Sequence, residues 1–321
     1  MVKGKENGII IDGIPKDSIY IISDKTKTKI PVSIRFSGGE RRYLGDFKIS
    51  LKNNELFIVN IIGVEDYLIG VLAGEFAQAS THALEAQAVL SRTLVYSKML
   101  ANQKESFDLG DLTNDQAYSG FVSYSRFRDA INQTKDLVMT YQNKLIEPFW
   151  FSTCGNRFIT PDVAWGGEKL AYLRHKNQPI LKSEHKCRKS PHFYWERKLP
   201  IAMINELFKP KYRYEIYQPY PFIQADKVFI LENKWLYPEH FRLKINRRLG
   251  WNFIKSNDYQ MTHFGAYVQL KGYGLGHNIG LCQCEAEALS QAGIDFQQIL
   301  EKYYVGIVLK PFYQTPEFLR L

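Results

Sequence analysis

The sequence predicts an α+β fold, a mixed sheet covered by a layer of helices. Residues 1–62 contain short apolar runs separated by Gly, Asn, Asp and Pro, a pattern typical of antiparallel strands joined by turns. From residue 64 the apolar residues recur with helical spacing. Near the C-terminus, a strand, a glycine-rich turn and two helices are expected in that order.

The strand predictions rest on the apolar runs themselves. They cover residues 9–11, 19–22, 32–36, 56–59, 137–141, 148–151 and 264–270.

The helix predictions rest on capping residues and on spacing. Ser80 or Thr81 can cap a helix over residues 83–100, and small residues recur along it in steps of three and four, which predicts one face packed on the core. Further helices are expected over residues 124–134, 284–292 and 296–303.

We divide the chain into four parts. They are an N-terminal β-rich part (1–62), a catalytic core (63–174), a flanking or inserted β-rich subdomain with long loops (175–262), and a C-terminal segment that returns to complete the core (263–321). The motifs near the two ends of the chain are expected to form a central cleft together.

Composition narrows the classes of function. An apolar content of 45% in 321 residues is enough for a substantial core, and the net charge of +9 is compatible with a polyanionic partner. Charges interrupt every long apolar run, so no membrane span is expected, and no secretory signal is visible in these residues. No helix-turn-helix, zinc-finger or RNA-binding pattern supports a nucleic-acid partner.

Glu75 is the candidate catalytic acid. It ends the apolar run 64–76 and has Leu72, Ala73 and Phe76 as neighbours. A carboxyl group beside an apolar wall is poorly hydrated, and desolvation favours its protonated, proton-donating form. The alternative is a helix-terminal salt bridge to Arg92 or to a lysine.

The glycine-rich run 272–280 does not have the spacing of a dinucleotide-binding loop or a P-loop. We interpret it as a bend that places His277 in a cleft.

Several separated motifs resemble the signature of the SpoIID/LytB domain family. They are Glu65-Asp66-Tyr67-Leu68-Ile69-Gly70-Val71, Gly74-Glu75, Glu85-Ala86-Gln87-Ala88-Val89 with Arg92-Thr93, Asp115-Gln116-Ala117-Tyr118-Ser119-Gly120, Ser152-Thr153-Cys154-Gly155-Asn156, Gly276-His277-Asn278-Ile279-Gly280-Leu281-Cys282-Gln283 and Tyr303-Tyr304-Val305-Gly306. One departure is Glu285, which stands where the family usually has glycine.

The resemblance implies a peptidoglycan lytic transglycosylase. Such enzymes cleave the β-1,4 bond between N-acetylmuramic acid and N-acetylglucosamine, preferably in strands without stem peptides, and leave 1,6-anhydro ends. Glu75 matches the position of the catalytic acid, and one carboxyl group can serve as acid and then as base. No cofactor is required. An extracytoplasmic location is implied, and the alternative function is a non-catalytic glycan-binding module or an amidase modulator.

The resemblance also implies substrate-binding residues, namely Arg92, Gln116, Tyr118, Ser152, His277 and Gln283. Three of them have structural alternatives. Arg92 could form a buried ion pair, Tyr118 could belong to the core, and His277 could be a satisfied structural histidine.

Four cysteines are too few for a disulfide scaffold in a chain of this length. Cys154, His185, Cys187 and His192 have the side chains that zinc prefers, although their spacing matches no standard finger. A structural zinc site, a disulfide between Cys154 and Cys187, and free thiols all remain open.

Overall fold

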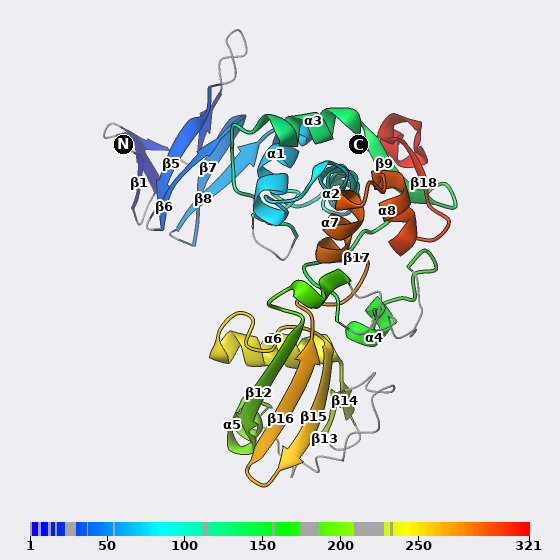
Figure 1. Cartoon of the computed structure of the whole chain (residues 1–321). Helices are drawn as coiled ribbons and strands as arrows, with labels where there is room; N and C mark the ends of the chain where they lie inside the picture. The colour runs from blue at the N-terminus through cyan, green and yellow to red at the C-terminus, as the bar shows by residue number, and fades with distance from the viewer. Residues whose placement is uncertain are drawn as a thin grey trace. The chain divides into compact units, whose positions relative to one another are not determined.

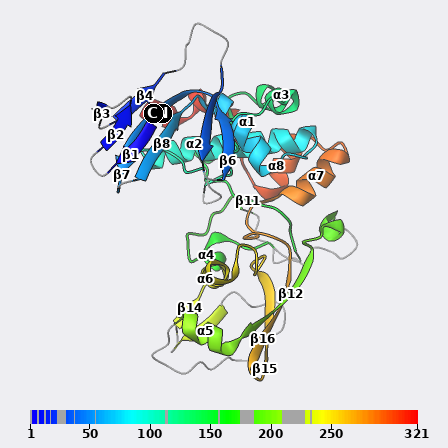
Figure 2. The same ribbon diagram turned by 90° about the vertical axis from the view of Figure 1, so that its left-hand side faces the viewer.

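The computed structural model describes residues 2–5, 8–11, 14–16, 18–22, 30–36, 38–53, 55–111, 115–155, 158–173, 186–208, 228–231 and 234–321. The chain forms two compact units: unit 1 comprises Met1–Glu147 and Val308–Leu321, and unit 2 comprises Pro148–Ile307. Unit 2 is therefore an insertion in the sequence of unit 1. Both units combine helices with sheets (Figures 1 and 2), which confirms the α+β class.

The N-terminal part of unit 1 consists of antiparallel strands, as the turn-rich sequence predicted. The sheets are β1 (Val2–Lys5), β2 (Gly8–Ile11) and β3 (Ile14–Lys16); β4 (Ser18–Ile21), β7 (Asp46–Lys52) and β8 (Glu55–Ile61), in the order β4-β7-β8; and β5 (Val32–Phe36) with β6 (Gly39–Tyr43). In β7, Phe47 and Ile49 alternate with more exposed residues and turn one face inward.

Three helices form the core of unit 1. They are α1 (Val64–Glu75), α2 (Thr81–Ala101) and α3 (Ser125–Gln133). Ser80 is the N-cap residue of α2. The prediction that α2 packs through a single face is wrong, because residues 83–95 are all buried. The reason is tertiary: α1, α3 and β9 (Leu137–Tyr141) all pack against α2.

The C-terminal residues return to unit 1. β18 (Val308–Pro311) pairs antiparallel with β9, whose other edge carries β10 (Lys144–Leu145). The 3₁₀ turns η2 (Phe312–Gln314) and η3 (Pro316–Arg320) follow. The Phe312 ring stacks on Tyr96 of α2 with 3.7 Å between centroids, and so anchors this segment to the helical core.

Unit 2 contains an antiparallel sheet with the order β12-β16-β15, formed by Tyr194–Pro200, Tyr267–Tyr273 and Asp258–Phe264. The helices α5 (Ile201–Phe208) and α6 (Pro238–Leu249) cover one face through a shared apolar cluster (Figure 1). The strand predicted over 264–270 is confirmed over 267–270 as part of β16, but its start is wrong because residues 265–266 form the turn of the β15–β16 hairpin. This hairpin also crosses the expected division after residue 262. A separate hairpin pairs β13 (Val228–Leu231) with β14 (Lys234–Leu236).

The remainder of unit 2 brings distant segments together. β11 (Trp150–Phe151) pairs in parallel with β17 (Leu281–Cys282). α7 (Gln283–Gln291) packs against β17, η1 (Lys186–Lys189) and α8 (Phe296–Tyr303), whereas α4 (Pro161–Ala164) packs against α6. The predicted helix over 296–303 is confirmed, and α7 begins one residue earlier than expected. Among the described residues, no helix has the length and apolar character that a membrane span requires.

Candidate functional site

Glu75 is the last residue of α1, where the backbone N–H of Phe76 bonds the Leu72 carbonyl. The side chain is half-buried, and its Oε1 accepts a hydrogen bond of 2.5 Å from the Ala117 N–H. The last turn of α1 contains no basic residue. The carboxyl group is therefore oriented from one side by the backbone and keeps contact with the surface.

The segment 115–118 runs beside the end of α1. Asp115 forms an ion pair of 2.9 Å with Lys98 of α2, which fixes the segment on the helical core. Gln116 is buried and donates from Nε2 to the Tyr67 hydroxyl at 3.2 Å. Its Oε1 is buried as well and has no hydrogen-bond partner among the described residues. Gln116 and Ala117 thus link the candidate acid to the side chain of a core tyrosine.

Tyr118 belongs to the core. Its ring contacts Tyr67 and Tyr43 with centroid distances of 4.7 and 5.8 Å, and its hydroxyl donates to Asn60 Oδ1 at 3.0 Å. Burial raises the pKa of Tyr118 well above its ordinary value. Gly70 of α1 allows this approach, because a Cβ there would lie 2.6 Å from the Tyr118 ring. The geometry corresponds to the structural alternative for Tyr118.

Arg92 lies inside the core and is fully buried. Its Nε and Nη2 donate to the two carboxylate oxygens of Glu65, both at 2.7 Å. Further bonds go to the backbone carbonyls of Ile131 and Leu137. One guanidinium group thus joins α1, α2, α3 and β9, which is the ion-pair alternative for this residue.

Three further candidates lie in unit 2. Ser152 is half-buried, with its Oγ 3.2 Å from Thr153 Oγ1, and its carbonyl accepts the Cys284 N–H at 2.9 Å. Gln283 is buried and is the first residue of α7. The sequence motif that contains both residues is therefore part of the β11–β17 junction.

His277 sits in the predicted bend, between glycines whose φ angles are positive. Its Nδ1 accepts the Ile279 N–H at 3.1 Å, and the ring also forms a hydrogen bond with the backbone of Trp150. Burial lowers the pKa of His277 to about 4. The imidazole is therefore neutral near pH 7, and both of its nitrogens have partners within unit 2.

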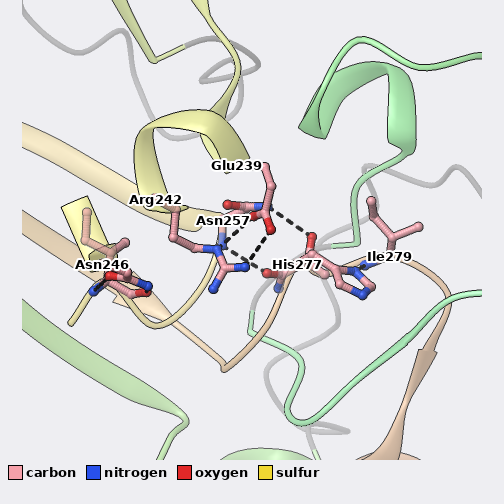
Figure 3. Close-up of polar contacts among 8 residues, drawn as sticks. Glu239, Arg242, Asn246, Asn257, His277 and Ile279 are labelled. Atoms are coloured by element: carbon pink, nitrogen blue, oxygen red, sulfur yellow. Dashed lines mark hydrogen bonds and ion pairs between the residues drawn. The ribbon is translucent and has the colours of Figure 1, made fainter. Parts of the chain in front are cut away.

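Close to His277 lies a polar network that the sequence did not indicate. Arg242 donates to both carboxylate oxygens of Glu239, at 2.7 and 2.6 Å, and Asn257 Nδ2 donates to Glu239 at 2.8 Å (Figure 3). Burial opposes the charge on Glu239, but the Arg242 hydrogen bonds outweigh it and hold the pKa of that carboxyl below its ordinary value. Asn257 connects the network to the backbone carbonyl of His277 at 3.4 Å. The only signal in the sequence was a Glu and an Arg three residues apart on a helix.

The cysteines cluster differently from the prediction. Cys154 and Cys187 do meet, with 3.2 Å between their Sγ atoms, and Cys282 joins them at 3.6 Å from Cys187. His192 instead lies with its Nδ1 3.3 Å from Lys255 Nζ, and His185 is outside the described residues. All four cysteines are free thiols in the structure.

The seven site residues predicted from the sequence thus fall into two groups. Glu75, Arg92, Gln116 and Tyr118 lie in unit 1, whereas Ser152, His277 and Gln283 lie in unit 2. Within unit 1, Gln116 and its neighbours lie beside Glu75, while Arg92 is held by Glu65 at the other end of α1.

Comparisons with known proteins agree on one family. Residues 52–141 match the family model described as Stage II sporulation protein. The chain is 24% identical to the stage II sporulation protein D of Bacillus subtilis over 88% of this chain and 84% of that protein. It is 25% identical to the Bacillus amyloliquefaciens protein of the same name, over 78% and 74%.

A further relative has a different name. The chain is 26% identical to the amidase enhancer of Bacillus subtilis, over 76% of this chain and 40% of that protein. The family model covers α1, α2, α3 and Glu75, which are the elements that position the candidate acid. Over residues 52–141 the chain matches the SpoIID family, and over most of its length it is similar to the stage II sporulation protein D of two Bacillus species.

Proposed function

We propose that this protein is a peptidoglycan lytic transglycosylase with Glu75 as its acid and base. The observation that carries the proposal is the position of Glu75. Its half-buried carboxyl group ends α1 and is bonded by the Ala117 N–H, within the segment that matches the family model. Arg92 and Tyr118 are buried by comparison, and their polar groups bind internal partners.

The chemistry requires one carboxyl group that changes its protonation state. The protonated Glu75 donates its proton to the oxygen of the scissile glycosidic bond as the bond to C1 of N-acetylmuramic acid breaks. The C6 hydroxyl of the same sugar bonds to C1 and closes the 1,6-anhydro ring. Its proton passes to the Glu75 carboxylate, which regenerates the acid. No water enters the products, so the reaction is an elimination-type cleavage and not a hydrolysis.

The charge of the chain suits this substrate. Glycan strands without stem peptides expose a lactyl carboxylate on each N-acetylmuramic acid, and the chain carries a net charge of +9. Long-range attraction between a basic protein and a polyanion raises the local concentration of substrate. The proposal places the protein's activity outside the cytoplasm, where its substrate lies.

The amidase enhancer relative supports a second candidate. In that case the protein binds glycan strands or stimulates a cell-wall amidase without cleaving sugars. The two candidates differ in a single measurable product, the anhydro end.

The test compares Glu75→Gln with a matched Glu105→Gln variant, since Glu105 is an exposed glutamate outside the site. Each protein is incubated with intact and with denuded peptidoglycan, and the products are analysed by mass spectrometry. We expect anhydro products from the parent chain and from Glu105→Gln, and a decrease of about 10²–10⁴-fold for Glu75→Gln. The circular dichroism spectrum of Glu75→Gln should match that of the parent.

Three results would contradict the proposal. Anhydro products at an undiminished rate from Glu75→Gln would remove this residue from the mechanism. Reducing ends in place of anhydro ends would make the enzyme a hydrolase. Stimulation of an amidase with no sugar cleavage by the parent chain would favour the second candidate.

A further inference from the structure

We propose that Cys154, Cys187, Cys282 and Cys284 hold a structural zinc ion in unit 2. The starting point is the three buried thiols of the cluster, whose Sγ atoms all lie within 4.8 Å of one another. They come from three separate segments: the loop after β11, η1, and the end of β17. The proposal is independent of the glycan chemistry proposed for Glu75.

The spacing of the sulfur atoms suits a shared metal ion. A zinc ion bound to four thiolates has Zn–S distances of about 2.3 Å, which places neighbouring sulfurs about 3.8 Å apart. The observed separations are 3.2 Å for Cys154–Cys187 and 3.6 Å for Cys187–Cys282. An outward movement of about half an ångström per sulfur is enough to admit the ion. Side-chain torsions can supply a shift of this size.

Cys284 is suited to be the fourth ligand. Its thiol forms a hydrogen bond with the thiol of Cys187, so it already borders the cluster. Cys284 is half-buried, whereas the other three cysteines are fully enclosed. Four sulfur ligands with no position left open to solvent are typical of a structural site, since catalytic zinc keeps one position for water or substrate.

The backbone around Cys282 is arranged for a sulfur that carries negative charge. The N–H groups of Cys154 and Glu285 both point at its Sγ, at 3.0 and 3.4 Å. Cys282 is also the N-cap of α7, where the positive end of the helix dipole favours an anion. Such N–H donors stabilise a thiolate in the shell around a metal ion.

The charged groups near the cluster are compatible with a negatively charged metal–thiolate site. Glu285 is the nearest buried carboxylate along the chain, but Lys302 binds it at 3.1 Å and the Tyr303 hydroxyl at 2.9 Å. In η1, the residues flanking Cys187 are the basic Lys186, Arg188 and Lys189. Four thiolates and one Zn²⁺ carry a net charge of −2, and basic residues next to a ligand in the sequence favour such a charge.

The ligand chemistry selects zinc. Four sulfur donors in a tetrahedron favour Zn²⁺ or iron, and exclude the oxygen-preferring Mg²⁺ and Ca²⁺. On binding, the thiols release their protons to solvent and the sulfurs bond the ion, with no change of oxidation state. The ion would tie η1 and the start of α7 to the loop after β11, a connection that apolar packing of such short segments supplies poorly.

The first experiment measures metal in the full chain, purified under reducing conditions from cells supplied with zinc. We expect one zinc ion per chain by elemental mass spectrometry. Removal of zinc by a strong chelator should make the four thiols reactive toward a thiol reagent. It should also lower the unfolding midpoint reported by tryptophan fluorescence, because all five tryptophans lie in unit 2.

Variants locate the ligands. Cys187→Ser and Cys282→Ser should each retain less than about a tenth of the zinc. Cys284→His should keep the ion, since imidazole is an acceptable zinc ligand. Ser190→Ala is the matched control, because Ser190 lies next to η1 but offers no thiol, and its zinc content should be unchanged.

One measurement does not depend on any variant folding. Replacing zinc by Co²⁺ in the parent chain should give the intense visible bands of a tetrahedral thiolate centre. A chain that holds no metal would overturn the proposal, as would an intact mass showing a Cys154–Cys187 disulfide or a content of iron in place of zinc.

Discussion

The two ends of α1 carry half-buried glutamates with different hydrogen-bond partners. At the start of the helix, both carboxylate oxygens of Glu65 accept from one edge of the buried Arg92 guanidinium. At its end, Glu75 is half-buried and bonded by the backbone N–H of Ala117. Both oxygens of the Glu65 carboxylate accept from Arg92, although the side chain is partly exposed. The contrast separates a carboxylate that is paired with a buried cation from one that a backbone N–H binds.

The largest loss of stability is expected at the start of α1, where Arg92 pairs with Glu65. Arg92→Met leaves Glu65 without its cation and removes the bonds that the guanidinium donates to the Leu137 and Ile131 carbonyls. Removing one partner of a buried pair costs about 3–5 kcal/mol, and the partial exposure of Glu65 reduces this to about 2–4 kcal/mol. Urea unfolding followed by circular dichroism, with hydrogen exchange of the α1 and α2 amides, measures the loss.

Arg128→Met is the control for that substitution, because Arg128 is an exposed residue of α3. Its effect should stay within about 0.5 kcal/mol. If Arg92→Met changes the free energy of unfolding as little as Arg128→Met does, the Arg92–Glu65 pair does not stabilise the fold.

The second prediction concerns His277, whose ring nitrogens both have partners within unit 2. A histidine whose pKa is about 4 in the folded chain and 6.5 when unfolded stabilises the fold fully above pH 6.5. Between pH 6.5 and 4 the unfolded chain binds the proton more readily, so stability falls with pH. The loss approaches about 2–3 kcal/mol at pH 4. Tryptophan fluorescence during urea unfolding measures it in unit 2.

In that experiment, His277→Gln should flatten the stability profile between pH 6.5 and 4. His240→Asn serves as the control, since His240 is exposed, and should leave the slope in place. If the slope survives in His277→Gln, another group causes it.

The smallest effect concerns Tyr118, which the family resemblance assigned to the substrate. Tyr118→Phe loses the hydrogen bond to Asn60 and should cost about 1 kcal/mol of stability. Because the hydroxyl bonds inside the core, the rate of anhydro-product formation should change little. A large loss of rate with stability unchanged would mean that the Tyr118 hydroxyl acts on the substrate together with Glu75.

Local sequence patterns predicted helices and strands best where both a capping or turn residue and a clear apolar spacing were present. The helix over 296–303 was correct because Asp295 caps it through the Gln298 N–H and its apolar residues follow helical spacing. The strand over 137–141 was correct as well. The start of the strand over 264–270 was misplaced because the turn at Gly265 carries no proline or asparagine and both of its flanks are apolar.

The site was predictable only in part, for a physical reason. The resemblance assigned Gln116 and Glu75 to the same site, but spacing along the chain could not show that Arg92 binds Glu65, because this contact forms across two helices. The same holds for Cys282, which reaches Cys154 through the parallel pairing of β11 with β17. Contacts between segments far apart in sequence depend on the tertiary fold, which local periodicity does not contain.

The pairing of β18 with β9 determines the order in which the chain can fold. During translation, β9 is synthesised before unit 2 and β18 after it. One edge of β9 therefore has no β18 partner until the whole of unit 2 has been synthesised. An unpaired strand edge invites association with other chains. A nascent protein with this topology gains from a unit 2 that folds quickly, because only then can the last strand close the sheet.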